Sequence, residues 1–476
     1  MNKNELAMNF RLIKDNEKAS LTYIVANILS KGVYFLTIPI FTRLLSTSEM
    51  GVTTTFSSWQ TILYAVMSLG LVSGSFNVAM ITYEKQRDQY MTNSLLLTSI
   101  SAFVFLIFAT LFGDRWEMLT GLPPSTMWIM SIYLFLQPAM DFWYARQRYE
   151  NKYKAVFWVS VISTLSSTMI SVLAVKIISE INGIYNLGTV KIAAQFIVIF
   201  IFSLFFYIKI FQKGKIIFDK RMIRFSLCLS IPLVIHSLSK NILDISDRIM
   251  IANMCGQSKA GIYGIVYTIS LMGLIVWNAI NSAFVPEMFK NLNELKYVQT
   301  EEKIYKLIKA FGEISVVAVL FSPELIHILT TEEYYDAVIL FPPLFASVFL
   351  TSIYNIYGNF LLYKKCTLYI MYATLIATII NIVSNYILIQ ILGYMVAAYT
   401  TLLATIVLVI GQGVMQKYTY EDEVINHKKI ALYGIIGTMA CLFSGLIFEM
   451  GILRYTIIIF IVIVASNDIK RILLKN

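Results

Sequence analysis

The chain has 476 residues, of which 58% are hydrophobic and only 14% are charged. Soluble domains carry roughly 25% charged residues, so composition excludes a water-soluble globular fold. The net charge of +10 does not indicate nucleic-acid binding, because the basic residues lie in short clusters between apolar runs rather than along one face. A membrane protein is therefore expected.

A polar tail of mixed charge over residues 1–20 is followed by apolar runs that recur from Leu21 to Ser466. A run of about 20 apolar residues crosses a hydrocarbon layer of roughly 30 Å as a helix. The sequence predicts an all-α polytopic membrane protein with about fourteen transmembrane helices. They are expected at 21–45, 52–80, 91–112, 126–145, 155–178, 188–208, 225–252, 260–285, 307–329, 338–362, 368–391, 394–415, 431–449 and 452–466.

The connections between these spans differ in basic residues on alternate sides. One set, together with both termini, holds 29 Lys and Arg residues, whereas the opposite set holds 4. Basic residues are retained on the cytoplasmic side. Both termini are therefore predicted to be cytoplasmic, and an even number of spans agrees with this.

A weak internal repeat relates the first span to the seventh, because Leu29, Ser30 and Lys31 match Leu238, Ser239 and Lys240. The repeat predicts two six-helix halves with the substrate between them. We expect an N-terminal lobe at 1–208, a basic cytoplasmic linker at 209–224, a C-terminal lobe at 225–416, and two appended helices with a cytoplasmic tail at 417–476.

The seventh span carries a charged stripe of His236, Lys240, Asp244 and Asp247, with Arg248 beside it. Steps of four, four and three residues place the first four on one face of a helix. Such a face does not contact lipid, so it either lines a polar interior or pairs with other helices. One interpretation is that the carboxylates neutralise the cations. The other is a cavity whose cations meet an anionic substrate and whose carboxylates or histidine bind an ion or proton.

Two further cations lie in the first span. Lys31 is near its middle and has no acidic neighbour in that helix, so we expect either an anionic ligand or a carboxylate from the seventh span. Arg43 lies at the outer end, where a long side chain can reach the interface. Arg43 is therefore the weaker candidate for substrate contact.

Two other charged residues have ordinary structural explanations. Lys191 lies near the outer end of the sixth span, where snorkelling to the interface or local pairing is expected. Asp141 is close to Arg146 and Arg148 in sequence, and an ion pair with them is expected.

No catalytic or metal-binding pattern is present in the sequence. The four cysteines are scattered singly, which supports neither a disulfide framework nor a zinc site. There is no phosphate-binding G-x-x-x-x-G-K-[ST] loop, no H-E-x-x-H and no suitably placed G-x-S-x-G. We expect no catalytic residues, no metal and no cofactor, and hence a protein that is not an enzyme.

Short motifs occur at matching places in the two halves. The first half has the segment from Pro39 through Arg43 to Ser46, followed by Glu49 and Gly51. The second half has Asp247 and Arg248, Gly256, the segment from Ala260 and Gly261 to Tyr263, and the segment from Phe284 to Pro286. Together these motifs resemble those of Wzx-type polysaccharide flippases, which belong to the multidrug, oligosaccharidyl-lipid and polysaccharide exporter superfamily.

The resemblance covers the whole chain and implies two six-helix lobes in a V around a central cavity. It implies transport of undecaprenyl-pyrophosphate-linked oligosaccharide from the inner to the outer leaflet of the bacterial cytoplasmic membrane by alternating access, for O-antigen or capsule biosynthesis. Lys31, Lys240, Arg248 and Arg43 are the expected substrate contacts, and Asp244, Asp247 and His236 the expected sites of H+ or Na+ coupling. A polysaccharide polymerase is a further expected partner, and nucleic acid is not.

Two alternatives remain open from the sequence. A drug or metabolite antiporter of the same superfamily would prefer cationic substrates and an acidic cavity, which the basic residues in these spans disfavour. A membrane-embedded polymerase or ligase would act on the same lipid-linked sugars. It would be expected to carry catalytic groups on sizeable external loops, and the outer loops of this chain are short.

Overall fold

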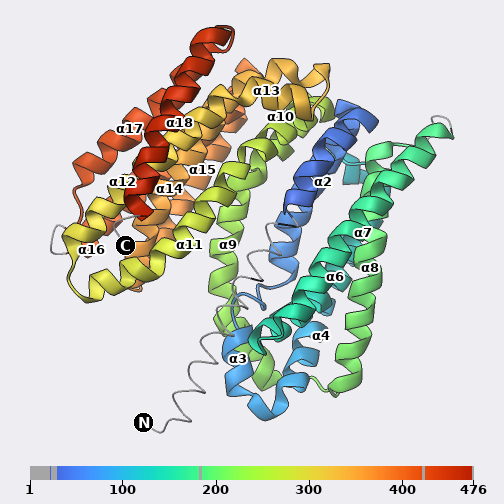
Figure 1. Ribbon diagram of the computed structural model, residues 1–476. Helices are drawn as coiled ribbons and strands as arrows, with labels where there is room; N and C mark the ends of the chain where they lie inside the picture. The colour runs from blue at the N-terminus through green and yellow to red at the C-terminus, as the bar shows by residue number, and fades with distance from the viewer. Residues whose placement is uncertain (1–21, 23–28, 30, 182–184, 421–423, 474–476) are drawn as a thin grey trace. The chain divides into compact units, whose positions relative to one another are not determined.

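The computed structural model describes residues 22, 29, 31–181, 185–420 and 424–473, except for the side chains of residues 236 and 465–473. Helices joined by turns make up this part of the chain, which contains no strand. The chain folds as two compact units, unit 1 (Met1–Leu238) and unit 2 (Ser239–Asn476) (Figure 1).

Unit 1 begins with a helix over residues 31–44 and continues with mostly long helices. They are α2 (Thr47–Met67), α3 (Phe76–Thr82), η1 (Glu84–Gln86), α4 (Arg87–Leu111), η2 (Gly113–Arg115), α5 (Trp116–Thr120), α6 (Ser125–Tyr149), α7 (Tyr153–Glu180), α8 (Leu187–Lys213) and the first part of α9 (Lys220–Cys255).

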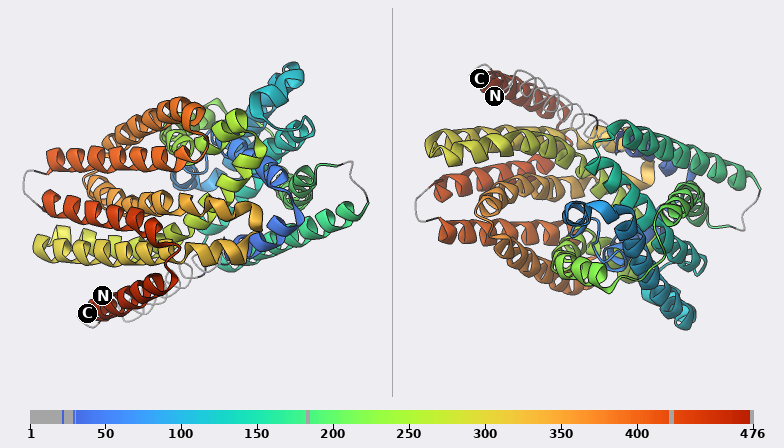
Figure 2. Two further views of the ribbon diagram at one scale, coloured as in Figure 1. Left: turned by 90° about the horizontal axis from the view of Figure 1, so that it is seen from above. Right: turned by 90° about the horizontal axis from the view of Figure 1, so that it is seen from below.

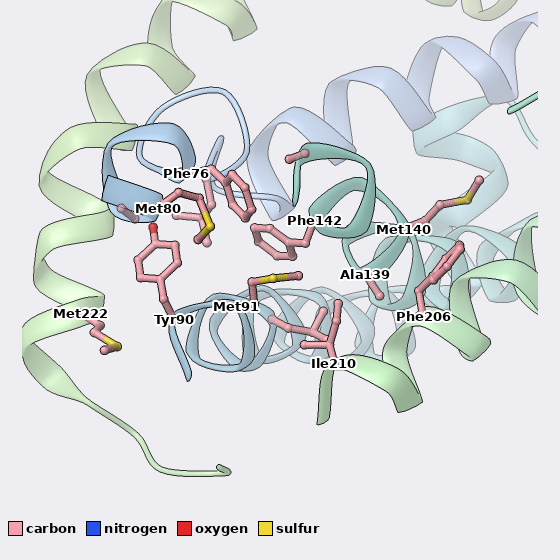
Figure 3. Close-up of a cluster of buried hydrophobic side chains, with 14 residues drawn as sticks. Phe76, Met80, Tyr90, Met91, Ala139, Met140, Phe142, Phe206, Ile210 and Met222 are labelled. Atoms are coloured by element: carbon pink, nitrogen blue, oxygen red, sulfur yellow. The ribbon is translucent and has the colours of Figure 1, made fainter. Parts of the chain in front are cut away.

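A cluster of buried aromatic and methionine side chains holds one end of unit 1 together (Figure 3). Phe76 of α3 stacks on Phe142 of α6, with ring centroids 5.9 Å apart. Tyr90 of α4 is fully buried, and its hydroxyl lies 2.8 Å from the hydroxyl of Ser226 in α9. The first part of α9 is therefore integral to the core of unit 1.

Unit 2 contains the rest of α9 and the remaining helices. They are α10 (Gln257–Ser270), α11 (Met272–Asn293), α12 (Tyr297–Leu320), α13 (Ser322–Leu329), η3 (Glu332–Leu340), α14 (Phe341–Tyr363), α15 (Thr367–Leu392), α16 (Val396–Thr419), α17 (His427–Ser444), η4 (Gly445–Ile447) and α18 (Gly451–Leu473). Within this unit α14 packs against α16 and α17, and α16 packs against α15, as one bundle (Figures 1 and 2).

The all-α polytopic membrane fold is confirmed, and helices occupy every expected span in the described residues. Of these helices, nine are long and apolar enough to cross a bilayer by themselves. The number is ten if Gly113–Thr120 and Ser125–Tyr149, which meet at a bend of 92°, together form one span. The number is below fourteen partly because α12 carries the charged residues Glu301, Glu302 and Lys303 in its first two turns. The first expected span also includes residues outside the described ones.

The second expected span, 52–80, is broken rather than continuous. Helix α2 ends at Met67 and α3 begins at Phe76, and Leu69 and Gly70 between them have φ angles of 51° and 57°. In the same connection a Cβ on Gly74 would lie 2.7 Å from the Cα of Ser230 in α9. The break therefore allows a close approach to α9 that any larger residue at 74 would prevent.

Helix α9 is shared by the two units, and Pro232 lies inside it. Its first part packs on the α2–α3 connection and on α4, as described above. In unit 2, the hydroxyl of Thr378 in α15 donates a 3.0 Å hydrogen bond to the carbonyl of Ser239 in α9. The predicted linker 209–224 forms the end of α8, a connection at 214–219 and the start of α9.

Candidate functional site

A polar cavity of about 220 Å³ lies in unit 2, between α9, α10, α14 and α16. Lys240, Asp244 and Arg248 of α9 line it, because four-residue steps bring them to one side of the helix. Asp247 was predicted to share that face, but it points instead toward α10, α15 and α16, where it finds hydrogen-bond donors. Arg248 takes its place in the cavity.

Lys240 and Asp244 form an ion pair inside this cavity, with Nζ 3.0 Å from Oδ2. The Lys240 ammonium also donates a 3.3 Å hydrogen bond to the hydroxyl of Tyr354 in α14. The two charged side chains keep 45% and 46% of their surface exposed. Asp244 therefore neutralises Lys240, in agreement with the interpretation that the carboxylates neutralise the cations. Both side chains nevertheless remain partly exposed to the cavity.

Arg248 has no carboxylate within ion-pair distance among the described residues, so the interpretation in which a carboxylate of α9 neutralises it does not apply to this residue. Its guanidinium lies over the ring of Tyr267, 4.4 Å from the centroid. The Nε atom is buried and has no hydrogen-bond partner in the described part of the chain. A planar guanidinium without a carboxylate partner can donate hydrogen bonds to the carboxylate or phosphate of a ligand.

Asp247 is only 1% exposed and is surrounded by neutral donors. Its Oδ2 accepts 2.7 Å hydrogen bonds from the hydroxyls of Tyr263 and Thr401, and its Oδ1 accepts a 3.4 Å bond from Asn385. Burying an ionised carboxylate among neutral groups is costly. The arrangement is one in which the carboxylate gains from binding a proton or a small cation.

The polar shell around Asp247 extends to a second layer. Asn385 donates to Oδ1 of Asn381 at 3.2 Å and accepts from Thr400, while Ser246 donates to the same Asn381 oxygen at 3.2 Å. Among the described atoms, the Asn381 amide nitrogen is buried without a partner. The side-chain oxygens of this shell and the Asp247 carboxylate are hard ligands, which bind hard cations.

The other predicted site residues lie in unit 1 or outside the described side chains. Lys31 is exposed in the helix at 31–44 and forms no ion pair with the described residues. Arg43 is also exposed, and its Nη1 donates a 2.7 Å hydrogen bond to the carbonyl of Pro39. His236 lies in α9, but its side chain is outside the described ones.

Lys191 does not reach the interface, contrary to the sequence-based expectation. It is 5% exposed, and its ammonium lies 4.0 Å from the ring centroid of Phe41. A small recess of about 90 Å³ beside it is lined by Tyr34, Gln60 and Gln195, among others. No carboxylate of the described residues pairs with this buried amine.

Asp141 was expected to pair with Arg146 or Arg148, and this is wrong. Its carboxylate accepts hydrogen bonds from the hydroxyl of Tyr64 in α2 and from the amide of Gln137, 2.9 Å away. Among the described residues, no cation lies within ion-pair distance of this carboxylate. Asp141 thus joins α2 to α6 rather than pairing with the arginines at the end of α6.

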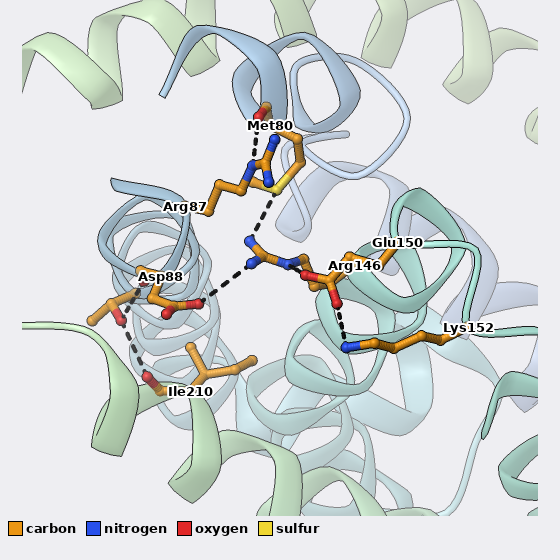
Figure 4. A network of polar contacts seen from close by, with 8 residues as sticks. Met80, Arg87, Asp88, Arg146, Glu150, Lys152 and Ile210 are labelled. Atoms are coloured by element: carbon orange, nitrogen blue, oxygen red, sulfur yellow. Dashed lines mark hydrogen bonds and ion pairs between the residues drawn. The ribbon is translucent and has the colours of Figure 1, made fainter. Parts of the chain in front are cut away.

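Arg146 belongs to a separate network at the basic end of unit 1 (Figure 4). Its guanidinium pairs with Glu150 and lies 3.9 Å from Asp88, while Lys152 lies 2.6 Å from Glu150. Partial burial raises the pKa of Glu150, but the hydrogen bonds from Lys152 and Arg146 outweigh it, so the pKa lies below its usual range.

The family-like motifs acquire structural explanations. Ser46 caps α2 in a capping box with Glu49, and a Glu49 carboxylate oxygen also accepts a 2.9 Å bond from the backbone of Leu187 at the start of α8. In the second half, Tyr263 donates to Asp247. The motif residues thus hold helices together within each unit.

Comparison with protein families gives two matches. Residues 18–292 match the model described as polysaccharide biosynthesis protein, and residues 232–387 match the MatE model. Comparison with curated proteins gives no significant match.

Solved structures of several transporters have the same fold. The lipid II flippase MurJ in an inward closed conformation has a TM-score of 0.67 at 14% identity, covering 96% of this chain and 99% of that one. A multidrug resistance MATE family transporter in an inward-facing conformation has a TM-score of 0.61 at 15% identity, covering 82% and 95%. A transporter of the MOP superfamily from Pyrococcus furiosus has a TM-score of 0.52 at 16% identity, covering 89% and 96%. The predicted fold family is thereby confirmed.

Proposed function

Because the chain belongs to the polysaccharide biosynthesis protein family, whose model matches residues 18–292, we propose that it is a flippase for lipid-linked oligosaccharides. It moves undecaprenyl-pyrophosphate-linked repeat units from the inner to the outer leaflet by alternating access. The product serves the assembly of a surface polysaccharide such as O-antigen or capsule. The membrane is the bacterial cytoplasmic membrane, with both termini on the cytoplasmic side.

The observation that carries this proposal is the cavity with Lys240 and Arg248. Its volume of about 220 Å³ is smaller than the roughly 300–1,000 Å³ of sites that enclose drug-sized ligands. A diphosphate group matches its size and charge better than a whole oligosaccharide does. Arg248 would bind the group through two parallel hydrogen bonds and Lys240 as a point charge, while the sugars occupy other polar surface. Lys31 and Arg43 are the corresponding candidates in unit 1.

An inward ion gradient would reset the transporter, and Asp247 is its best candidate site. The carboxylate is buried among neutral donors, so H+ or Na+ would relieve the cost of burial. Asp244 is already paired with Lys240. It would bind the coupling ion only when the substrate draws the Lys240 ammonium away from it. His236 is kept as a candidate from its place in α9.

A drug antiporter is the second candidate, favoured by the MatE match over residues 232–387. The lining of the unit 2 cavity argues against it, because Lys240 and Arg248 outnumber Asp244 there. A cationic drug would meet a net positive site. A polymerase or ligase is disfavoured because the solved structures with the same fold are those of a flippase and a transporter, and a polymerase is instead expected as a partner.

The test is the leaflet in which lipid-linked repeat units accumulate. Replacing both Lys31 and Lys240 by Ala, at unchanged protein level, should abolish surface polysaccharide and leave the units in the inner leaflet. Lys306→Ala, at an exposed site in α12, is the matched control and should behave as the parent. Normal surface polysaccharide in the double variant would refute the site, and accumulation in the outer leaflet would point to a polymerase.

A further inference from the structure

A recess of about 250 Å³ at the basic end of unit 1 plays no part in the proposed transport site. Helices α4, α6 and α8 form its walls, and residues just beyond α6 complete it. Its charged lining consists of four cations and two carboxylates: Arg146, Lys152, Lys209, Lys213, Asp88 and Glu150. The recess therefore carries a net positive charge.

The two carboxylates are already engaged within this lining. Glu150 pairs with Arg146 and with Lys152, and Asp88 lies 3.9 Å from Arg146 (Figure 4). Lys209 and Lys213, one turn apart on α8, pair with no carboxylate of the described residues. The Lys209 ammonium lies instead over the ring of Phe205, 4.2 Å from its centroid. Two positive charges thus remain for an external anion.

The surface beside these lysines is apolar and exposed. On α8, Leu204, Phe205 and Ile208 are 37%, 50% and 48% exposed, although this helix is one of the candidate spans. The connection that follows α8 exposes Ile216, Ile217 and Phe218. Lipid chains cover such residues along a span, and apolar residues at its end insert into the interface.

The connection is held in place by side-chain contacts with α4. Gln89 donates a 2.8 Å hydrogen bond to the carbonyl of Lys215, and its own carbonyl accepts a 2.9 Å bond from the Lys215 amide. The apolar side chains of 216–218 are therefore presented on an ordered backbone next to the recess. A cationic recess and an adjoining apolar surface form the two halves of a site for an amphiphilic anion.

We propose that this recess binds the phosphate of an anionic phospholipid of the cytoplasmic leaflet, with its acyl chains along the exposed face of α8. The charge asymmetry of the connections places this end on the cytoplasmic side, where anionic lipids attract basic residues next to the membrane. A single phosphodiester charge suits the two uncommitted lysines. The site is independent of the proposed transport of oligosaccharide.

The test compares lipid binding by the full-length protein and two charge-matched variants in nanodiscs or by native mass spectrometry. Lys209→Gln with Lys213→Gln should weaken binding of phosphatidylglycerol by about thirtyfold, since each basic residue near the surface contributes roughly fivefold. Lys290→Gln with Lys306→Gln removes two exposed charges from unit 2 that do not line the recess and should weaken binding much less. Phosphatidylethanolamine should bind equally to all three proteins.

The outcomes separate the sources of the phosphate. Equal weakening in both double variants would overturn the proposal, because the effect would then be one of general charge. Loss of undecaprenyl diphosphate binding with phosphatidylglycerol binding intact would also overturn it, since the recess would then serve the transported lipid. Selective loss of phosphatidylglycerol supports it whether or not oligosaccharide transport is established.

Discussion

Replacing Lys240 and Asp244 singly and together distinguishes a substrate contact from a structural ion pair. Their side chains are spaced i and i+4 on α9 and are 45% and 46% exposed. Such a pair contributes about 0.3–0.5 kcal/mol to stability. Neither Lys240→Ala nor Asp244→Ala should therefore lower the amount of folded protein.

The two variants should differ strongly in substrate binding. A hydrogen bond to a charged group contributes about 1.5–3 kcal/mol, so Lys240→Ala should weaken binding of undecaprenyl diphosphate by roughly 10- to 140-fold. Asp244→Ala frees the lysine from its competing carboxylate, so it should bind the same ligand as tightly as the parent or more tightly. Binding to purified protein in nanodiscs, with thermal unfolding as the control, measures both.

The double variant completes the cycle. If the pair only holds α9 together, both single variants and the double variant will show the same small loss of stability and unchanged ligand affinity. That pattern would refute the assignment of Lys240 to the substrate. A double variant as weak in binding as Lys240→Ala supports it.

Three further predictions concern other buried or paired groups. Asp247→Asn should abolish the dependence of transport on an ion gradient while retaining a folded protein, and gradient-driven transport at the parental rate would contradict this. Lys191→Met should raise the free energy of unfolding by about 1–3 kcal/mol, because an apolar side chain replaces an unpaired buried amine; reduced stability on denaturation would contradict this. Glu150→Gln should destabilise unit 1 at neutral pH but not in acid, since the lowered pKa of Glu150 stabilises the fold above the normal carboxyl range and that contribution vanishes as pH falls through the folded pKa. Thermal unfolding would contradict this if the stability difference between Glu150→Gln and the parent were the same at every pH.

The sequence was sufficient to predict the helices but not their interruptions. Hydropathy sets the spans because any lipid-facing helix must be apolar along its length. Hydropathy does not reveal the break at Leu69 and Gly70 or the 92° bend before α6. The only sequence signal for the break after α2 is the pair of glycines at 70 and 74. The break is needed because Ser230 of α9 approaches Gly74 closely, and Ser230 lies far away in the sequence.

The candidate site was predictable to the extent that it is local. The pair of Lys240 and Asp244 follows from helical spacing, but the donors to Asp247 do not. Thr401 is 154 residues away in the chain, and Asn385 is 138 away. The amides and hydroxyls of α15 and α16 were the available signal, because polar groups in apolar spans seek partners just as charges do.

The arrangement of α9 has a thermodynamic consequence. Asp244 faces the cavity and Asp247, three residues later, faces the polar shell, while the same helix packs through Ser230 in unit 1. If an ion at Asp247 changes the affinity of the cavity for an anion tenfold, the anion must change the affinity for the ion tenfold in return. Measuring one ligand at saturating and zero concentrations of the other therefore yields the coupling free energy from either side, and the two values must agree.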